Sequence, residues 1–263
     1  RKKLRMNVCM VSYSYYESDN RVRRYAESLV QSGDTVDVIA IRQKNVQRYE
    51  NIRGVHVYRI QTREKNEKKK LDYLFRVVLF LVKSFFYLTW RHMRSSYDLV
   101  HVHSVPDFEV FAALVPKLFG AKVILDIHDI VPEFYAGKFN AGNCNFSTRA
   151  LIRIERLCCE FADHVIISND LWRKLLVSRS VVESKCTSVI NYPDSTIFVR
   201  SKTKPDYNGG PFTIIYPGTL NYHQGVDVAV RAMARVTNEA PNVKFNIYGL
   251  GPLAPTLEEL IQE

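Results

Sequence analysis

Paired cysteines are missing from this sequence. Five cysteines occur, of which Cys158 and Cys159 are adjacent, and no two stand at the spacing of a zinc-binding pair. An odd number without a framework spacing argues against a disulfide-stabilised scaffold and against a zinc site. The pattern favours a protein of the reducing cytoplasm.

Glycine and proline are also few, 11 and 10 residues of 263, while hydrophobic residues make up 46% of the chain. This composition argues against a disordered chain and predicts one large globular domain or two. The turn after the first predicted strand lacks the Gly-x-Gly-x-x-Gly pattern of dinucleotide-binding domains. An NAD site is therefore not expected there.

Acidic residues are outnumbered, and the formal net charge is +10. A basic surface suits nucleic acid, an anionic membrane face or phosphorylated ligands. The basic residues are dispersed, and no recognised nucleic-acid-binding helix or stacking platform accompanies them. Nucleic acid is therefore the least favoured of these partners.

The longest apolar segment is interrupted by charge. A helix is predicted over residues 71–91, where Asp72, Arg76 and Lys83 form one narrow polar stripe. Charges at mid-span are costly in a membrane, so we favour a well-buried core helix. The alternative is peripheral docking on an anionic membrane through residues 63–91. The net charge of +3 in residues 63–70 supports docking by roughly 1 kcal/mol per cation.

What the sequence does contain is a regular alternation of strands and helices, typical of a doubly wound α/β fold. Strands are predicted at 6–12, 35–41, 55–60, 98–104, 122–127, 163–168, 188–191, 212–216 and 243–248. Helices are predicted from Asp19 or Asn20, over 71–91, 110–119 and 151–161, from 226, and toward 263. Residues 201–211 are polar and rich in glycine and proline, as linkers are. We predict a Rossmann-like domain over 1–200, a linker over 201–211 and the start of a second Rossmann-like domain over 212–263.

Polar residues stand at the ends of two predicted strands. His128 and Asp129 follow strand 122–127, and ligands bind beyond the carboxyl ends of parallel strands. A polar strand end that only hydrogen-bonds a neighbouring loop is an equal alternative. His101 and His103 share one face of strand 98–104, and we expect His103 to be the more exposed. No acidic or cysteine partner stands at ligand spacing, so a metal is not expected.

Several motifs occur in a characteristic order. They are Asp98-Leu-Val-His-Val-His103, Ile127-His128-Asp129, Val189-Ile-Asn191-Tyr-Pro193-Asp194, Tyr216-Pro-Gly-Thr-Leu-Asn-Tyr-His-Gln-Gly225-Val-Asp227 and Ile247-Tyr-Gly249-Leu-Gly251-Pro252. Each motif alone is weak. Together they resemble the retaining glycosyltransferases of family 4, which have the GT-B fold, over essentially the whole chain.

The resemblance implies that the first domain binds the acceptor and the second binds a UDP- or GDP-linked sugar. It places His128, followed by Asp129, at the reaction centre beside the donor sugar. The residues that it assigns to the donor are Gly218, Thr219, His223, Gln224, Gly225, Gly249 and Gly251. The residues that it assigns to the acceptor cleft are Asp19, Arg21, His103, Glu133 and Asn191. Asp19 is alternatively only a helix cap.

The resemblance further implies an enzyme that extends a glycan or lipid-linked acceptor of a cell-surface polysaccharide or glycolipid. The cysteine pattern places it in the cytoplasm, and docking through residues 63–91 would make it peripheral on the inner membrane face. Such enzymes need no metal, and no Asp-x-Asp pair occurs in this sequence. Two departures stand out. Thr219 and Gln224 replace the two cations that usually meet the donor diphosphate, with His223 beside the latter. Residues 212–263 are also shorter than the ~100–150 residues of such a domain, so we expect little activity from this chain alone.

Two other functions remain open at this stage. Nucleotide-sugar epimerases and glycosyl phosphorylases share the GT-B fold, so the reaction class can differ while the architecture stays the same. A non-catalytic binding module that docks on membranes through residues 63–91 is the alternative from another class. Product analysis separates the enzymes, and vesicle binding tests the module.

Overall fold

The computed structural model describes residues 5–63, 70–104, 106–133, 146–193, 198–199 and 210–262. The chain divides into two compact units, Arg1–Tyr192 and Pro193–Glu263. Most of the predicted linker (201–209), the lysine-rich residues 64–69, Asp194 and the side chain of His223 lie outside the described part.

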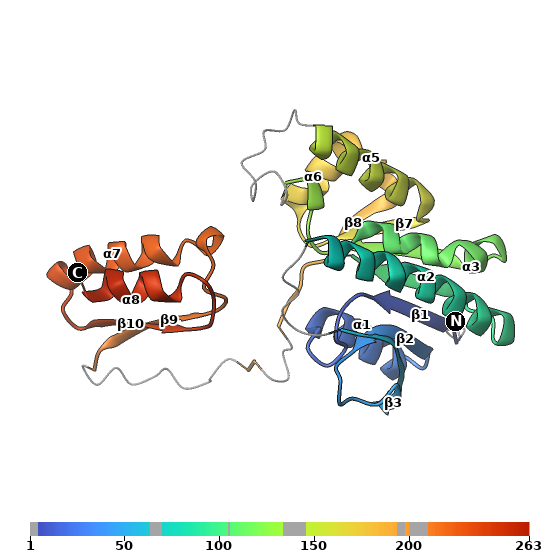
Figure 1. The fold of residues 1–263 in the computed structure, drawn as a ribbon, viewed down its shortest axis with the longest axis horizontal. Helices are drawn as coiled ribbons and strands as arrows, with labels where there is room; N and C mark the ends of the chain where they lie inside the picture. The colour runs from blue at the N-terminus through green and yellow to red at the C-terminus, as the bar shows by residue number, and fades with distance from the viewer. Residues whose placement is uncertain are drawn as a thin grey trace. The chain divides into compact units, whose positions relative to one another are not determined.

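Among the described residues, the first unit forms an eight-stranded sheet in the order β3-β4-β2-β1-β5-β6-β7-β8 (Figure 1). The strands are β1 (Asn7–Ser12), β2 (Thr35–Arg42), β3 (Tyr49–Ile52), β4 (Val55–Thr62), β5 (Leu99–His103), β6 (Lys122–Ile127), β7 (His164–Ile167) and β8 (Cys186–Ser188). Neighbours pair in parallel except for β3 with β4. Strand order runs outward from β1 in both directions, so the predicted doubly wound fold is confirmed.

The helices of this unit follow the strands in the predicted alternation. They are α1 (Asn20–Gln31), α2 (Lys70–Arg94), η1 (Asp107–Ala113), α3 (Leu114–Leu118), α5 (Phe146–Phe161), α6 (Asp170–Arg179) and η2 (Glu183–Lys185), where η marks a 3₁₀ helix. Asp19 caps α1 by accepting a hydrogen bond from the backbone N–H of Val22 at 3.1 Å. The predicted helix start at this residue is confirmed.

The two faces of β5 differ sharply. Val100 and Val102 belong to the apolar core that lies beneath α2, η1 and α5. Because side chains alternate along a strand, His101 and His103 lie on the opposite face, where the ring of Tyr25 from α1 packs against both. At β5, one face of the sheet is therefore closed by apolar packing, and the other carries the polar groups beside the second apolar core under α1.

Strand register brings these polar groups together. The pairing of β1 with β5 sets Ser12 beside His103, and the pairing of β5 with β6 sets His103 beside Asp126. Neighbouring strands in a sheet lie about 4.8 Å apart. Three residues distant in sequence therefore share one small area near the carboxyl ends of the strands.

Some elements differ from the prediction, and local chemistry explains two of them. The predicted helix 110–119 is a 3₁₀ helix, η1, followed by the short α3. Pro116 lies in the first turn of α3, where its missing N–H is tolerated, and it could not continue an α-helix from the preceding residues. The strand β3 was not predicted, because YENI lacks an apolar pattern and gains its order from antiparallel pairing with β4.

The last strand of the first unit was predicted too far along the sequence. The prediction put it at 188–191, but β8 covers Cys186–Ser188. Cys186 faces the core, while Ile190 and Asn191 are exposed beyond the strand. The helix α6 before it was not predicted.

The prediction of a well-buried α2 was wrong. Its buried side chains form a single stripe of Val77, Phe80, Ser84, Leu88 and His92. Its large exposed apolar side chains are Tyr73, Leu74, Phe75, Val78, Val82, Phe86, Trp90 and Met93. Only one face of a helix can pack on a sheet. Because apolar residues occur all around this helix, those on its other sides remain exposed. By length and composition alone, Asp72–Arg94 is sufficient to cross a membrane, and only 22% of its most apolar window is buried.

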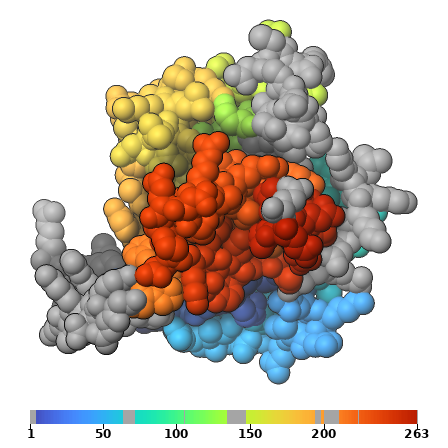
Figure 2. Space-filling view, turned by 90° about the vertical axis from the view of Figure 1, so that its left-hand side faces the viewer, coloured from blue at the N-terminus to red at the C-terminus, as the bar shows by residue number. Residues whose placement is uncertain are grey.

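The second unit is one strand–helix–strand motif followed by a helix. It comprises β9 (Phe212–Pro217), η3 (Tyr222–Gln224), α7 (Val226–Glu239), β10 (Val243–Tyr248) and α8 (Ala254–Gln262). β9 and β10 pair in parallel, and α7 and α8 pack together over them (Figure 1). In the space-filling view the orange surface of α7 adjoins the dark red surface of α8 (Figure 2). A small core around Leu220, Val230 and Leu257 joins the layers.

Candidate functional site

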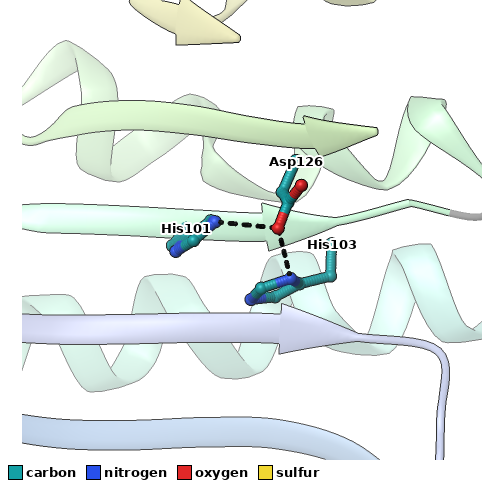
Figure 3. Close-up of side chains that lie close together, drawn as sticks. All are labelled: His101, His103 and Asp126. Carbon is teal, nitrogen blue, oxygen red and sulfur yellow. Dashed lines mark ion pairs between the residues drawn. The ribbon is translucent and has the colours of Figure 1, made fainter. Parts of the chain in front are cut away.

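The carboxylate of Asp126 in β6 is fully buried and is the centre of a polar network. Arg21, at the start of α1, donates to both oxygens: Nε lies 3.0 Å from Oδ2 and Nη2 lies 2.5 Å from Oδ1. His101 Nε2 and His103 Nδ1 lie 3.6 and 3.3 Å from Oδ2 (Figure 3). His128 Nε2, just after β6, is also 3.6 Å away. The side chain is thus surrounded by one cation and three imidazoles.

The surroundings fix the charges within this network. Burial alone would raise the pKa of Asp126, but the neighbouring histidines reverse that effect and hold it well below its ordinary value. Burial, together with His101, lowers the pKa of His103 to about 3. At neutral pH the pair therefore consists of a carboxylate and a neutral imidazole, with Arg21 as the compensating cation.

The single hydrogen of His103 can be assigned from its contacts. Within the described part of the chain its Nε2 is buried and unpartnered, whereas its Nδ1 faces Asp126 and lies 3.3 Å from His128 Nε2. A buried N–H without an acceptor is costly, so the hydrogen belongs on Nδ1. This N–H faces Asp126 Oδ2, and His128 Nε2 lies at the same 3.3 Å from His103 Nδ1.

The network borders an open polar hollow, which we call the His128 hollow. It has a volume of about 420 Å³ and lies at the carboxyl ends of β1, β6 and β7. Its lining residues are Ser14, Ser18, Asp19, Asn20, Arg21, His128, Asp129, Ser168 and Asn191. Every one of them is polar. Hydroxyl, amide and carboxylate groups of this kind can hydrogen-bond a polyhydroxylated ligand at many points.

Five of the residues singled out from the sequence meet in this hollow: Asp19, Arg21, His128, Asp129 and Asn191. The side chain of His128 is 22% exposed, and Asp129 is exposed. Ser168 holds the strand end by donating to the backbone carbonyl of His128 at 3.3 Å.

Two other predicted cleft residues lie elsewhere. The expectation that His103 would be the more exposed histidine was wrong, because Tyr25, His101 and His128 cover its ring completely. Glu133 is paired with Arg179 of α6 and does not line the hollow.

The chain also contains a group of potential metal ligands. One donor atom each from His101, His103 and Asp126 lies within 4.8 Å of the others. The sequence reasoning found no acidic partner for these histidines, and the structure corrects that, since Asp126 comes from the adjacent strand. A metal ion would compete with Arg21 for both carboxylate oxygens, so the arrangement as it stands is that of a charge-compensated hydrogen-bond network.

In the second unit, the predicted donor loop runs from β9 to α7. Gly218 N–H donates to the carbonyl of Tyr248 at 2.9 Å, and Leu220 N–H donates to that of Leu250 at 3.1 Å. A Cβ on Gly249 would lie 1.8 Å from the carbonyl oxygen of Gly218, and one on Gly251 would lie 2.1 Å from that of Leu220. These two glycines are therefore required for the loops after β9 and β10 to pack together.

The remaining donor-loop residues occupy the approach to α7. Thr219 and Gln224 are exposed. Gly225 has a φ of +66°, the left-handed conformation that favours glycine, and it immediately precedes the helix. The first turn of α7 has free backbone N–H groups, but it also carries Asp227.

Sequence reasoning missed Asp126 as a functional residue, together with the serines of the hollow. A signal was present: Asp126 is a charge inside an otherwise apolar strand, and a buried charge requires a partner. The partners themselves could not be read from sequence spacing, because Arg21 stands 105 positions away.

Comparisons with known proteins agree on one family. The model of the "Glycosyl transferase 4-like domain" matches residues 18–192. The gpi3 subunit of phosphatidylinositol N-acetylglucosaminyltransferase from Schizosaccharomyces pombe is 26% identical over 170 residues, which is 64% of this chain and 35% of that protein. The uncharacterized glycosyltransferase MJ1607 of Methanocaldococcus jannaschii is 26% identical over 274 residues, 89% of this chain and 59% of that protein. The chain thus spans about a third to three fifths of these relatives.

Solved structures share the fold at lower identity. Sucrose-phosphate synthase from Thermosynechococcus elongatus superposes with a TM-score of 0.74 at 17% identity, covering 98% of this chain and 67% of that one. HepE of Anabaena in complex with UDP-glucose gives 0.63 at 13% identity, covering 98% and 65%. These similarities identify the architecture as GT-B.

Proposed function

The chain belongs to the glycosyl transferase 4-like domain family, and we propose that it acts as a retaining glycosyltransferase that moves a sugar from a nucleotide-sugar donor to an acceptor. One observation carries this proposal: the His128 hollow, lined by polar residues at the carboxyl ends of parallel strands, with His128 held at its border. Parallel α/β sheets bind their ligands at this edge.

The donor in this proposal is a UDP- or GDP-linked sugar. HepE, which shares the fold, has been solved with UDP-glucose. In this chain the amino-terminal end of α7 offers backbone N–H groups to a diphosphate. Thr219 and Gln224 supply no fixed cation, so amides and the helix dipole carry more of the stabilisation of the leaving group. No metal is proposed.

His128 is the residue that we place beside the transferred sugar. The 3.3 Å contact of its Nε2 with His103 Nδ1 orients the ring, and the exposed part of the side chain can hydrogen-bond a sugar hydroxyl. Arg21 and Asp126 act one step further back, because Arg21 holds the carboxylate and the carboxylate contacts the ring of His103. Burial and His101 keep that ring neutral. Retention of the anomeric configuration requires no nucleophile from the enzyme if the acceptor attacks the sugar on the face that the diphosphate leaves. The hollow then needs hydrogen-bonding side chains rather than a nucleophilic one.

The acceptor in this proposal is a glycan or a lipid-linked glycan at the inner face of the cytoplasmic membrane. The exposed apolar face of α2 favours peripheral association, because large side chains such as Phe75 and Phe86 are 68% and 66% exposed. The name of the yeast relative indicates that it uses a phospholipid acceptor. Free buried cysteines, as found at Cys9, Cys158, Cys159 and Cys186, are compatible with a cytoplasmic protein.

A product assay tests the reaction class. The complete polypeptide is incubated with a panel of UDP- and GDP-linked sugars and with glycan and lipid-linked acceptors, with and without EDTA. We expect nucleoside diphosphate release and a glycoside that keeps the anomeric configuration of the donor, unaffected by EDTA. An inverted product contradicts retention, and a changed nucleotide sugar without a glycoside indicates an epimerase. A complete absence of donor turnover, in protein shown to be folded, overturns the proposal.

A further inference from the structure

A second cavity lies on the same unit, at the edge of the sheet between β4 and α2. We call it the β4–α2 groove. Its volume is about 810 Å³, and it shares no lining residue with the His128 hollow. Its lining residues are Arg42, Arg48, Tyr49, Tyr58, Arg59, Ile60, Gln61, Thr62, Val82, Lys83, Phe86, Tyr87 and Trp90. The volume is within the range of small-molecule sites, about 300–1,000 Å³.

One wall of the groove is cationic and uncompensated. Within the described part of the chain, the side chains of Arg48 and Lys83 have no ion-pair or hydrogen-bond partner, and the side chain of Arg42 donates only to the hydroxyl of Thr62, at 2.8 and 3.1 Å. Arg59 differs, because its guanidinium pairs with two carboxylates, Glu17 and Glu50, so that these three residues carry a net charge of −1. Among the described residues, Arg42, Arg48 and Lys83 therefore line one cavity without an acidic partner. Together with Arg59, Glu17 and Glu50 they carry a net charge of +2, which favours an anionic ligand.

The other wall is apolar and aromatic. Val82, Phe86 and Trp90 of α2 line the groove and are 45%, 66% and 44% exposed. The same side chains belong to the exposed apolar face of α2, so the groove opens directly onto that face. Aromatic rings beside lysine and arginine form the composition of protein surfaces at the boundary between headgroups and acyl chains.

We propose that the β4–α2 groove binds the headgroup of an anionic phospholipid, with its phosphate against Arg42, Arg48 and Lys83 and its acyl chains along Val82, Phe86 and Trp90. This inference rests on the membrane association in the proposed function and assigns the lipid class and the residues. The exposed face of α2 lies in the outer acyl layer of the same leaflet. The lipid is a docking ligand and not the acceptor.

The amphipathic lining selects this ligand over simpler anions. An inorganic phosphate would satisfy the cations but leave the wall of Val82, Phe86 and Trp90 in water. A zwitterionic lipid would cover that wall, but its headgroup has no net charge and would not compensate the three cations. An anionic phospholipid satisfies both walls at once.

Binding can be measured without a bilayer by using soluble short-chain lipids. Dihexanoyl phosphatidic acid is titrated against the folded chain, with dihexanoyl phosphatidylcholine and inorganic phosphate as comparisons, and tryptophan emission is recorded. Only two tryptophans occur, Trp90 and Trp172. We expect a saturable change with the anionic lipid at about tenfold lower concentration than with either comparison. Trp90→Phe removes this emission change.

Charge-matched variants locate the site. Arg48→Gln with Lys83→Gln removes two groove cations, and we expect the affinity for the anionic lipid to fall by about tenfold or more. Arg153→Gln with Lys174→Gln removes the same charge from exposed positions on α5 and α6. We expect this control to bind within about twofold of the parent, since neither residue lines the groove.

Several results overturn the proposal. Equal binding of both lipids removes the anionic requirement, and equal losses in both double variants reduce the effect to net charge. Phosphate that binds as tightly as the lipid identifies a free-anion site instead, and an acidic peptide that saturates Trp90 emission when the lipid does not identifies a protein partner. Because no nucleotide sugar is present, failure here leaves sugar transfer untouched, and failure of the transfer assay leaves lipid binding to be judged separately.

Discussion

The His128 hollow and the β4–α2 groove both contain arginines of the same unit, but the two sites place them in opposite states. Arg21 is 7% exposed and bound bidentately to a carboxylate that is completely buried. Arg48 is exposed, and neither it nor Lys83 has an acidic partner among the described residues. The charge of Arg21 is already paired within the fold, whereas the charge of Arg48 is available to bind an anionic ligand.

The difference has an energetic consequence. Removing one member of a buried pair leaves an uncompensated charge in a low-dielectric interior, while removing an exposed unpaired charge relieves repulsion. The hollow should therefore be sensitive in stability to single polar substitutions, and the groove should be tolerant. At His128, which contacts the network but is not its centre, a substitution should lower activity without a large loss of stability.

The largest expected effect on stability is that of Asp126→Asn. The amide cannot neutralise Arg21, so we expect the free energy of unfolding to fall by about 3–5 kcal/mol. Urea denaturation at pH 7 measures it. Asp163→Asn is the matched control: Asp163 is 32% exposed and pairs with Lys117 at 2.7 Å, and its loss should cost about 1 kcal/mol or less. Equal losses in the two variants would remove the distinction between the sites.

Acid should weaken the hollow in a defined window. The pKa of His103 is about 3 in the folded chain, below the ordinary 6.5, so the unfolded state binds a proton first as the pH falls. Stability should therefore decline from about pH 6.5 toward pH 3, with a slope of at most about 1.4 kcal/mol per pH unit from this group. Asp126, whose pKa is depressed, adds to the loss below about pH 4.

The variant His103→Gln checks the assignment of that slope. Denaturation midpoints measured from pH 7 to pH 4.5 should become less dependent on pH than in the parent. An unchanged pH dependence would show that another group titrates.

The smallest effects are expected in the groove. Arg48→Gln and Phe86→Ser each remove an exposed side chain and Lys83→Gln removes a half-buried one. We expect changes in the free energy of unfolding within about 0.5 kcal/mol. Thermal and urea denaturation measure them beside Asp126→Asn. A loss of several kcal/mol in any of the three would place that side chain in the folded framework and close the groove as a ligand site.

The sequence carried enough information for the architecture. Apolar strand runs, the cap at Asp19 and the break at Gly33 fix the first strand–helix–strand motif locally. The same reasoning located His128 at the end of β6, since an apolar run that stops at a polar pair marks the edge of a parallel sheet. These features depend on neighbours in sequence, which is why they could be predicted.

The rest depends on partners that are distant in sequence. Burial of His103 results from the rings of Tyr25 and His128, which reach it from α1 and from the end of β6. The role of Asp126 depends on Arg21, and strand pairing alone brings the neighbouring histidines to it. The face of α2 that packs on the sheet could not be chosen, because apolar residues occur on every side of that helix. Local sequence patterns predict the helices and strands, but contacts between these elements determine which side chains are exposed and which are charged.

Turnover in matched variants of the complete polypeptide tests the central claim most directly. With a water-soluble acceptor and saturating donor, His128→Ala should lower kcat by about 10²–10³-fold, with the free energy of unfolding changed by about 1 kcal/mol or less. Arg48→Gln with Lys83→Gln should leave kcat with the same acceptor unchanged. Full activity in His128→Ala, or a loss in the groove variant as large as in His128→Ala, would contradict the assignment of sugar transfer to the His128 hollow.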